Sequence, residues 1–113
     1  MRSVTVGGIL HALADPARLA IVIQLIHEEM NCGDTVHRAD LKDLPKSTAS
    51  HHFRILREAG LIHSERRGLE MISRVRRVEL DERFPGLLKT ILLSSARQKG
   101  IATKVAKGRR RAG

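Results

Sequence analysis

The 113-residue chain has one cysteine, no tryptophan, no tyrosine and only two phenylalanines. A single cysteine excludes an intramolecular disulfide, and no N-terminal apolar run reaches the length of a signal peptide or a membrane span. We therefore expect a cytoplasmic protein with no membrane partner. The scarcity of aromatic rings argues against single-stranded RNA as the main partner, because base stacking on such rings commonly carries that recognition.

Sequence signatures of common enzymes are absent as well. The chain has no glycine-rich phosphate-binding loop, no HExxH metalloprotease motif and no GxSxG nucleophile motif, and most of its carboxylates are interleaved with basic residues as on a solvated surface. We expect a protein that is not an enzyme and that needs no cofactor. A chain of this length is expected to form one domain with a single modest core.

Positive charge is concentrated at the C-terminal end. The chain carries 21 Lys and Arg against 12 Asp and Glu, a formal net charge of +9 that favours a polyanionic partner. Residues 97–113 hold seven of these basic residues and no acidic one, whereas residues 1–96 are nearly balanced. We predict a folded domain at residues 1–96 and a basic, flexible tail at residues 97–113, which is either a solvated end or an arm that contacts phosphates.

Two apolar helices are predicted at the N-terminal end. The first has one apolar stripe at helical spacing, formed by Val6, Ile9, Leu10 and Leu13. The Asp15-Pro16 pair is typical of a helix start and opens a second helix that runs to about residue 29. Because this second helix is apolar almost all round, we expect it to be central in the fold.

A helix-turn-helix is predicted in the middle of the chain. Residues 31–35 contain a glycine and predict a loop, and residues 36–44 predict a short positioning helix that ends before Pro45. Ser47 is a good N-cap for the next helix, residues 48–59, which Gly60 ends.

The helix at residues 48–59 has two different faces. The core side carries Ala49, Phe53 and Leu56, and the outward side carries Ser50, His51, Arg54 and Glu58. Small hydroxyls near a helix start let the backbone approach phosphates, and His and Arg one turn apart can donate to base edges in a major groove. The pattern alone also fits an ordinary amphipathic surface helix. His52 falls nearer the core side, so we expect a packed, hydrogen-bonded ring there and not a metal site shared with its neighbour.

A β-hairpin and a last helix are predicted after Gly60. Residues 61–67 and 70–78 are β-prone, and Gly68 between them permits the positive φ of a tight turn. Five arginines lie on these strands, where they contact a sugar-phosphate edge, keep an exposed hairpin from aggregating, or do both. The last helix has an apolar stripe wider than a small core needs, which favours a homodimer over a monomer that buries both terminal helices.

Two segments resemble one protein family. The string KSTASHHFRILREAGLI resembles the recognition-helix signature of the ArsR family of bacterial winged-helix transcriptional repressors, and LADPARLAIV resembles the opening of that family's second helix. The resemblance implies a winged helix-turn-helix fold, mainly α with a small β-hairpin, in the order α-α-α-α-β-β-α. It also implies a homodimer that pairs through its first and last helices. The predicted dimer residues are Ile9, Leu10, Leu13, Leu87, Leu88, Ile91 and Leu92.

The resemblance further implies a repressor of transcription whose partner is double-stranded DNA. Two copies of residues 48–59 would enter successive major grooves of a pseudo-palindromic operator. Two other hypotheses stay open: a non-specific nucleic-acid-binding or architectural protein driven by the basic tail, and a winged-helix module that binds protein. The predicted phosphate contacts are Lys46, Ser47 and Thr48. The predicted contacts to base edges are Ser50, His51 and Arg54, and the predicted contacts to the flanking DNA backbone are Arg66 and Arg67.

The metal-ligand motifs of ArsR-family sensors are missing from the sequence. The positioning helix lacks a Cys-x-Cys pair, and residues 87–98 contain no His, Asp or Glu. We predict no metal site, because the remaining candidates do not follow a known zinc spacing. These candidates are Cys32, Asp34, His37 and Asp40. For the Cys32 thiol, a structural role is favoured over a redox switch. The effector, a small molecule or a metal if there is one, stays unknown.

Overall fold

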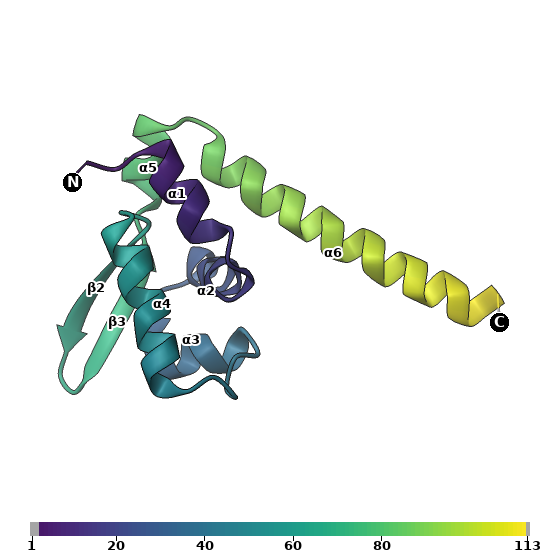
Figure 1. Ribbon diagram of the computed structural model, residues 1–113, viewed down its shortest axis with the longest axis horizontal. Coiled ribbons are helices and arrows are strands. Elements are labelled where there is room, and N and C mark those ends of the chain that lie inside the picture. The colour runs from purple at the N-terminus through teal and green to yellow at the C-terminus, as the bar shows by residue number, and fades with distance from the viewer. Residues whose placement is uncertain (1–2, 113) are drawn as a thin grey trace. The chain divides into compact units, whose positions relative to one another are not determined.

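The structure, a computed structural model, describes the backbone of residues 3–112 and the side chains of residues 3–99. The chain falls into two compact units, Met1–Leu80 and Asp81–Gly113. Figure 1 shows the elements, which are α1 (Val6–Leu13), α2 (Pro16–His27), β1 (Met30–Asn31), α3 (Cys32–Arg38), α4 (Lys46–Glu58), β2 (Ile62–Arg67), β3 (Glu70–Val75), α5 (Arg77–Arg83) and α6 (Leu87–Ala112).

The fold is mainly helical with a small β-hairpin, as the sequence predicts, but the predicted order omits β1 and α5. The second hairpin strand was expected to continue to Val78, and β3 ends instead at Val75. There the N–H of Arg76 donates to the carbonyl of Leu61 at 2.9 Å, and the carbonyl of Arg76 accepts a helical bond from Leu80 at 3.0 Å. The chain therefore turns directly into α5, although its β-branched residues favoured a longer strand.

The positioning helix is α3, and its predicted position, residues 36–44, is wrong. Asn31 caps the start of α3, because its Oδ1 accepts from the N–H of Asp34 at 2.7 Å and its carbonyl accepts from Oγ1 of Thr35 at 2.7 Å. This cap makes a helical turn of the stretch that was expected to be a loop. The helix ends early, and Asp40 follows it in the left-handed region with φ 59°.

The sheet has three antiparallel strands in the order β1-β3-β2, one more than the predicted hairpin. Strand β1 pairs Met30 with Ser73 of β3, and so ties the base of the hairpin to the segment that follows α2. On the hairpin itself, Oγ of Ser64 lies 2.7 Å from Oγ of Ser73 on the facing strand. The turn contains Gly68 with φ 63°, as predicted from the need for a positive φ.

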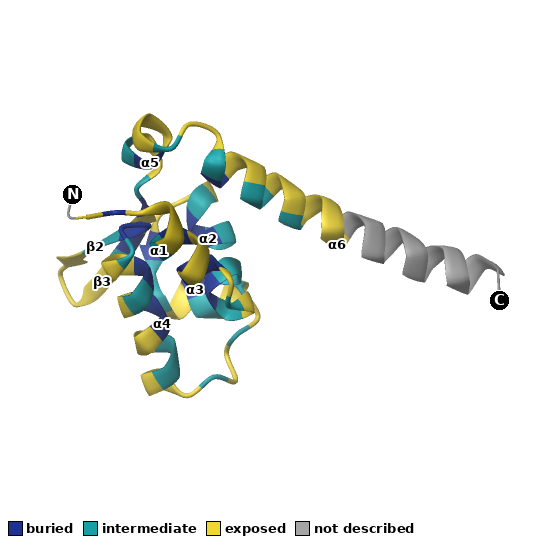
Figure 2. Ribbon diagram, turned by 45° about the horizontal axis from the view of Figure 1, so that its top comes forward, coloured by how far each residue is buried: buried dark blue, intermediate teal, exposed yellow. Residues whose placement is uncertain are grey.

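The core of the first unit gathers the apolar sides of α1, α2 and α4 and the inner side of the hairpin. Figure 2 shows buried residues on the sides of these helices that face one another. The most buried of the apolar side chains, at most 2% exposed, include Ile9, Ile21, Val22, Phe53, Leu56, Leu61 and Ile62. Complete burial of such a side chain stabilises the fold by about 1.5–3 kcal/mol. No single described helix is long and apolar enough to cross a membrane; only α1 and α2 taken together, bent by 103°, meet that length and composition.

The second unit contains the end of α5 and all of α6. Gly86 has φ 79° in the turn before α6, a conformation that glycine adopts without strain. In α6, Leu88 is buried and Leu93 is 52% exposed. The predicted basic tail, residues 97–113, lies within α6 up to Ala112; the side chains of residues 100–113 are outside the described residues, and the role of the tail stays a prediction.

Candidate nucleic-acid interface

The predicted recognition helix is α4, and it begins at Lys46 with Pro45 in the N-cap position. The prediction of Ser47 as the N-cap is wrong, since Ser47 lies in the first turn and the carbonyl of Pro45 accepts a helical bond from Ala49 at 3.0 Å. Proline fits this position because its ring fixes φ, here −56°. It has no side-chain acceptor, so the N–H groups of the first turn have no side-chain cap. Phosphate oxygens are suitable acceptors for such N–H groups.

Four of the predicted DNA contacts lie together on the outward side of α4. Ser47, Ser50, His51 and Arg54 line one groove, together with Arg57. Nδ1 of His51 accepts from Nη2 of Arg54 at 3.0 Å, because a guanidinium can only donate. This arrangement leaves Nε2–H of His51 and further N–H groups of Arg54 as donors toward a ligand in the groove. Arg57 was not among the predicted contacts, although its position one turn after Arg54 indicates the same side of the helix.

The two other predicted phosphate contacts on α4 lie beside this groove. Lys46 is exposed at the start of the helix and lines a neighbouring cavity between α3 and α4. Thr48 is half-buried and does not line the groove. The structure therefore separates the predicted contacts into a group that shares one surface and two residues at its margin.

The inner side of α4 is anchored by His52. Its side chain is 7% exposed, and its Nδ1 lies 3.3 Å from Nη1 of Arg18 in α2. The prediction of a packed, hydrogen-bonded ring at this position is confirmed. Arg18 is itself buried, and its Nε donates to the carbonyl of Ala12 at the end of α1 at 2.7 Å. One guanidinium thus connects α1, α2 and α4, a role that the sequence did not indicate.

The start of α2 is capped by Asp15, as predicted. Its Oδ1 accepts from the N–H groups of Ala17 at 2.8 Å and Arg18 at 3.1 Å. Burial alone would raise the pKa of the Asp15 carboxyl, but these two hydrogen bonds, together with the positive charges nearby, lower the pKa below its usual value. The ionised carboxylate therefore stabilises the first turn of α2, which contains Arg18.

The wing, which is the β2–β3 hairpin, presents its two predicted arginines differently. Side chains alternate along a strand, so Arg66 and Arg67 lie on opposite faces of the hairpin. Nη2 of Arg67 donates to Oε2 of Glu29 at 3.1 Å, and its Nε donates to Oε1 of Glu65 at 2.9 Å. These hydrogen bonds raise the pKa of Arg67 and lower that of Glu29. On the other face, Arg66 pairs in register with Met71 and makes no ion pair with any described residue.

Comparison with known proteins places these elements in a family. A family model described as a helix-turn-helix domain matches residues 13–65. The transcriptional regulator YceK of Bacillus subtilis, itself uncharacterized, is 33% identical over 85 residues, which are 74% of this chain and 82% of that protein. The chain belongs to the ArsR family of winged-helix transcriptional regulators.

Further comparisons agree with this assignment. SmtB, a transcriptional repressor of Mycobacterium tuberculosis, is 41% identical over 70 residues, or 61% of this chain and 49% of that protein, so the chain spans about half the length of this relative. The homodimeric winged helix-turn-helix domain Mb0332 of Mycobacterium bovis has a TM-score of 0.63 at 22% identity over 82% of both chains. The repressor BigR of Xylella fastidiosa has a TM-score of 0.58 at 23% identity, over 70% of this chain and 85% of that one. These two structures support the fold, and the sequence relatives are transcriptional regulators, not enzymes.

The cysteine of this ArsR-family chain lies at the start of α3. Burial raises the pKa of the half-buried Cys32 thiol, and the positive charge of Arg57 only partly opposes this effect. A thiol with a raised pKa is a weak nucleophile at neutral pH. Among the residues that the structure describes, no three His, Cys, Asp or Glu side chains come close enough to hold a metal ion.

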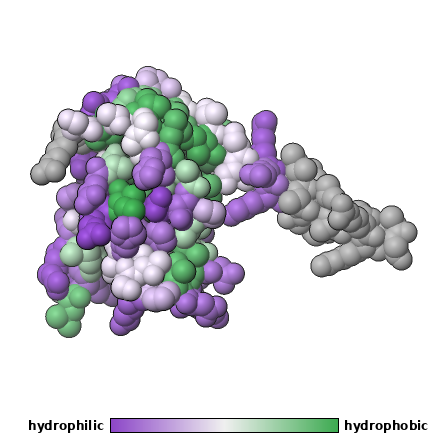
Figure 3. Space-filling model, viewed as in Figure 1, coloured by the Kyte–Doolittle hydropathy of each residue, from purple (hydrophilic) through white to green (hydrophobic). Residues whose placement is uncertain are grey.

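The predicted dimer residues differ in their exposure. Ile9 and Leu13 of α1 are at most 6% exposed, so they belong to the core of the first unit, and Leu88 of α6 is 4% exposed. Leu10 is 48% exposed, and Val6, one turn before it, is 43% exposed. Figure 3 shows hydrophobic surface over α1. The half-buried predicted residues are Leu87, Ile91 and Leu92.

Proposed function

We propose that this chain is a sequence-specific DNA-binding regulator that represses transcription as a homodimer on a pseudo-palindromic operator. One observation carries the proposal: the outward side of α4 brings Ser47, Ser50, His51, Arg54 and Arg57 into one groove lining that contains donors and no carboxylate. Hydrogen-bond donors and positive charge on an exposed helix suit the base edges and phosphates of a major groove.

The proposed contacts have separate roles. Ser50, His51 and Arg54 meet base edges, and the exposed start of α4 holds phosphates through its N–H groups, Lys46, Ser47 and Thr48. Arg57 lengthens the groove toward the DNA backbone. Arg66 and Arg67 of the wing contact the flanking sugar-phosphate edge. The rigid support behind α4, where Arg18 binds His52, keeps the base-contacting side chains in position.

Repression is proposed because the relative SmtB is a repressor. A homodimer is proposed because the Mycobacterium bovis domain is homodimeric and α1 exposes Val6 and Leu10. Two recognition helices related by a two-fold axis fit half-sites separated by about 34–36 Å, one turn of DNA. We propose that the two protomers pair through the first and last helices, α1 and α6.

The experiment is a fluorescence-anisotropy titration of the full chain at two salt concentrations. One duplex carries a site selected from a random-sequence library, and the other is a scrambled duplex of equal length. The expected result is tighter binding to the selected duplex, with an advantage that persists as salt rises. Equal and steeply salt-dependent binding to both, together with loss of nearly all affinity on truncation after Ala96, would instead support the tail-driven hypothesis.

A further inference from the structure

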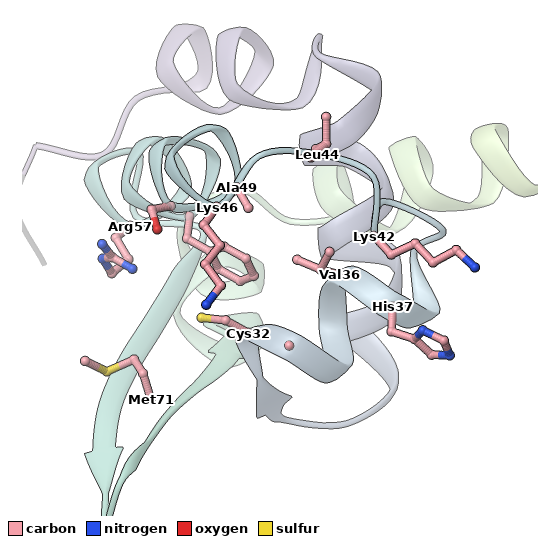
Figure 4. A pocket seen from close by; sticks show the side chains of 12 residues that line it. Cys32, Val36, His37, Lys42, Leu44, Lys46, Ala49, Arg57 and Met71 are labelled. Atoms are coloured by element: carbon pink, nitrogen blue, oxygen red, sulfur yellow. The ribbon is translucent and has the colours of Figure 1, made fainter.

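A cavity of about 660 Å³ lies between α3, α4 and the wing, next to the groove of the recognition helix (Figure 4). Cavities that bind small molecules commonly measure about 300–1,000 Å³ and are mostly apolar with a few polar groups. Here the apolar side chains are Val36, Leu44, Ala49, Phe53 and Met71.

The charge of the cavity has one sign. His37, Lys42, Lys46 and Arg57 line it, and no Asp or Glu does. In Figure 4, the Lys46 side chain extends from α4 toward Cys32, with Arg57 and Met71 on one side of it and Lys42 and His37 on the other. The electrostatic field of such a lining favours an anion over a neutral or cationic molecule.

Cys32 forms part of the cavity wall, and the state of its thiol bears on whether a ligand could bind covalently. Arg57 is near enough for its charge to act on the Cys32 thiol, yet burial still raises the pKa of that thiol. A neutral, polarizable thiol behaves as a small apolar group, so it adds to the apolar lining and not to the charge. A ligand is therefore expected to bind reversibly and without a covalent bond.

We propose that this cavity binds a small organic carboxylate with an apolar body, and that the bound anion weakens the interaction of α4 with DNA. The apolar body packs against Phe53 and Val36, and the carboxylate pairs with Lys46 and Arg57. The second part of the proposal rests on the proposed DNA-binding function, whereas the first part does not.

The coupling follows from residues that both sites share. Ser50 and Arg57 line the cavity and also the groove on the outward side of α4. Lys46 is a proposed phosphate contact as well as a cavity residue. An anion that holds these cations competes with DNA phosphates for them, and DNA must weaken anion binding by the same factor.

The anion site is tested first, in the absence of DNA, by calorimetric titration of the full chain with 2-naphthoate and with the uncharged 2-naphthamide. We expect naphthoate to bind about tenfold more tightly than the amide. In Arg57→Gln, this difference in affinity should be almost abolished. Arg38→Gln is the matched control, because Arg38 is an exposed arginine of α3 that does not line the cavity. Absence of naphthoate binding, equal binding of both compounds or an equal effect of both variants would overturn the site.

The single cysteine reports the location of the bound probe. Naphthoate in the cavity should slow alkylation of Cys32 by iodoacetamide several-fold, while naphthamide at the same concentration should slow it less. Unchanged labelling at saturating naphthoate would place the probe elsewhere and overturn the proposed site.

The coupling is tested with the selected duplex from the experiment on DNA binding. Saturating naphthoate should weaken binding of the wild-type chain about tenfold, as is typical of coupled sites, and should have less effect on Arg57→Gln. If the affinity for DNA is unchanged while naphthoate occupies the cavity, the proposed coupling is wrong. If the chain without naphthoate fails to discriminate any duplex, the proposed function fails, and the DNA-free titrations still decide whether the cavity binds the anion.

Discussion

Nη1 of Arg18 lies 3.3 Å from Nδ1 of His52, so a buried cation of α2 contacts the recognition helix from behind. Because a guanidinium only donates, His52 accepts through Nδ1 and carries its ring proton on Nε2. The same guanidinium donates to the carbonyl of Ala12. Two elements that precede the helix-turn-helix therefore fix the orientation of α4.

Removal of the Arg18 guanidinium is expected to loosen this support. Arg18→Met keeps an apolar stem but leaves the buried carbonyl of Ala12 and Nδ1 of His52 unpaired, which should lower the free energy of unfolding by about 2–3 kcal/mol. Urea denaturation measures this change. The exposed Arg54→Met serves as the control and should stay within about 0.5 kcal/mol of the wild type. Equal stability of both variants would show that the contact behind α4 contributes little.

The cap at Asp15 should make stability depend on pH. Its pKa is lowered in the folded state, so the carboxylate stabilises the fold fully above its unfolded pKa of about 3.9, and this contribution is lost as pH falls through the lower folded pKa. Asp15→Asn keeps a capping oxygen without the charge, whereas Asp15→Ala removes the cap and should cost about 1 kcal/mol at neutral pH. Urea midpoints at pH 7, 4 and 3 should show the difference between wild type and Asp15→Asn shrinking toward low pH. A difference independent of pH would contradict the role of the ionised carboxylate.

Helical spacing made much of the helix-turn-helix and the wing predictable. The opposite orientations of His51 and His52 follow from the 100° between neighbouring residues, and the hairpin turn follows from Gly68. The start of α3 was missed because Gly33 suggested a loop, while the Asn31 cap two residues earlier makes the helical turn. A local signal was present there, because asparagine is one of the residues that favour the N-cap position.

Other features depend on contacts that no local pattern contains. Strand β1 is two residues long and exists through its pairing with β3, far along the chain. Arg18 is buried because the end of α1 offers it a carbonyl, and a lone arginine in an apolar helix does not reveal this. Arg67 forms an ion pair with Glu29, which lies 38 positions earlier in the sequence. These relationships are consequences of tertiary packing, which overrides local preference.

Arg54 is expected to carry sequence preference. Arg54→Ala removes donors that reach base edges, and should cost about 1–3 kcal/mol on the selected duplex while blurring discrimination at the position it contacts. Lys46→Ala should instead weaken binding to all duplexes alike and reduce the salt slope by about 1. Anisotropy titrations on the selected and single-base-changed duplexes separate the two effects. The assignment of the outward face fails if Arg54→Ala leaves discrimination intact.

The two wing arginines should contribute unequally to DNA binding. Arg67 already donates to Glu29 and Glu65, so its replacement by alanine removes a charge that carboxylates largely balance. Arg66→Ala is expected to weaken binding to every duplex more than Arg67→Ala does. Glu29→Gln should strengthen binding slightly, because it releases Arg67 from one of its two carboxylates, and salt-dependent anisotropy measures all three variants. Equal losses for both arginines, with no effect of Glu29→Gln, would show that the ion pairs open when DNA binds.

The proposed homodimer should depend on Leu10. This side chain is 48% exposed in the protomer, so Leu10→Glu leaves the core intact and places a charge on the apolar surface of α1. We expect the wild type to sediment as a dimer and Leu10→Glu as a monomer whose affinity for a palindromic duplex falls at least about tenfold, because each half-site then binds alone. Leu69→Glu, at the 97% exposed tip of the wing, is the matched control and should stay dimeric. If Leu10→Glu also remains a dimer, the protomers pair through a surface that does not include this side of α1.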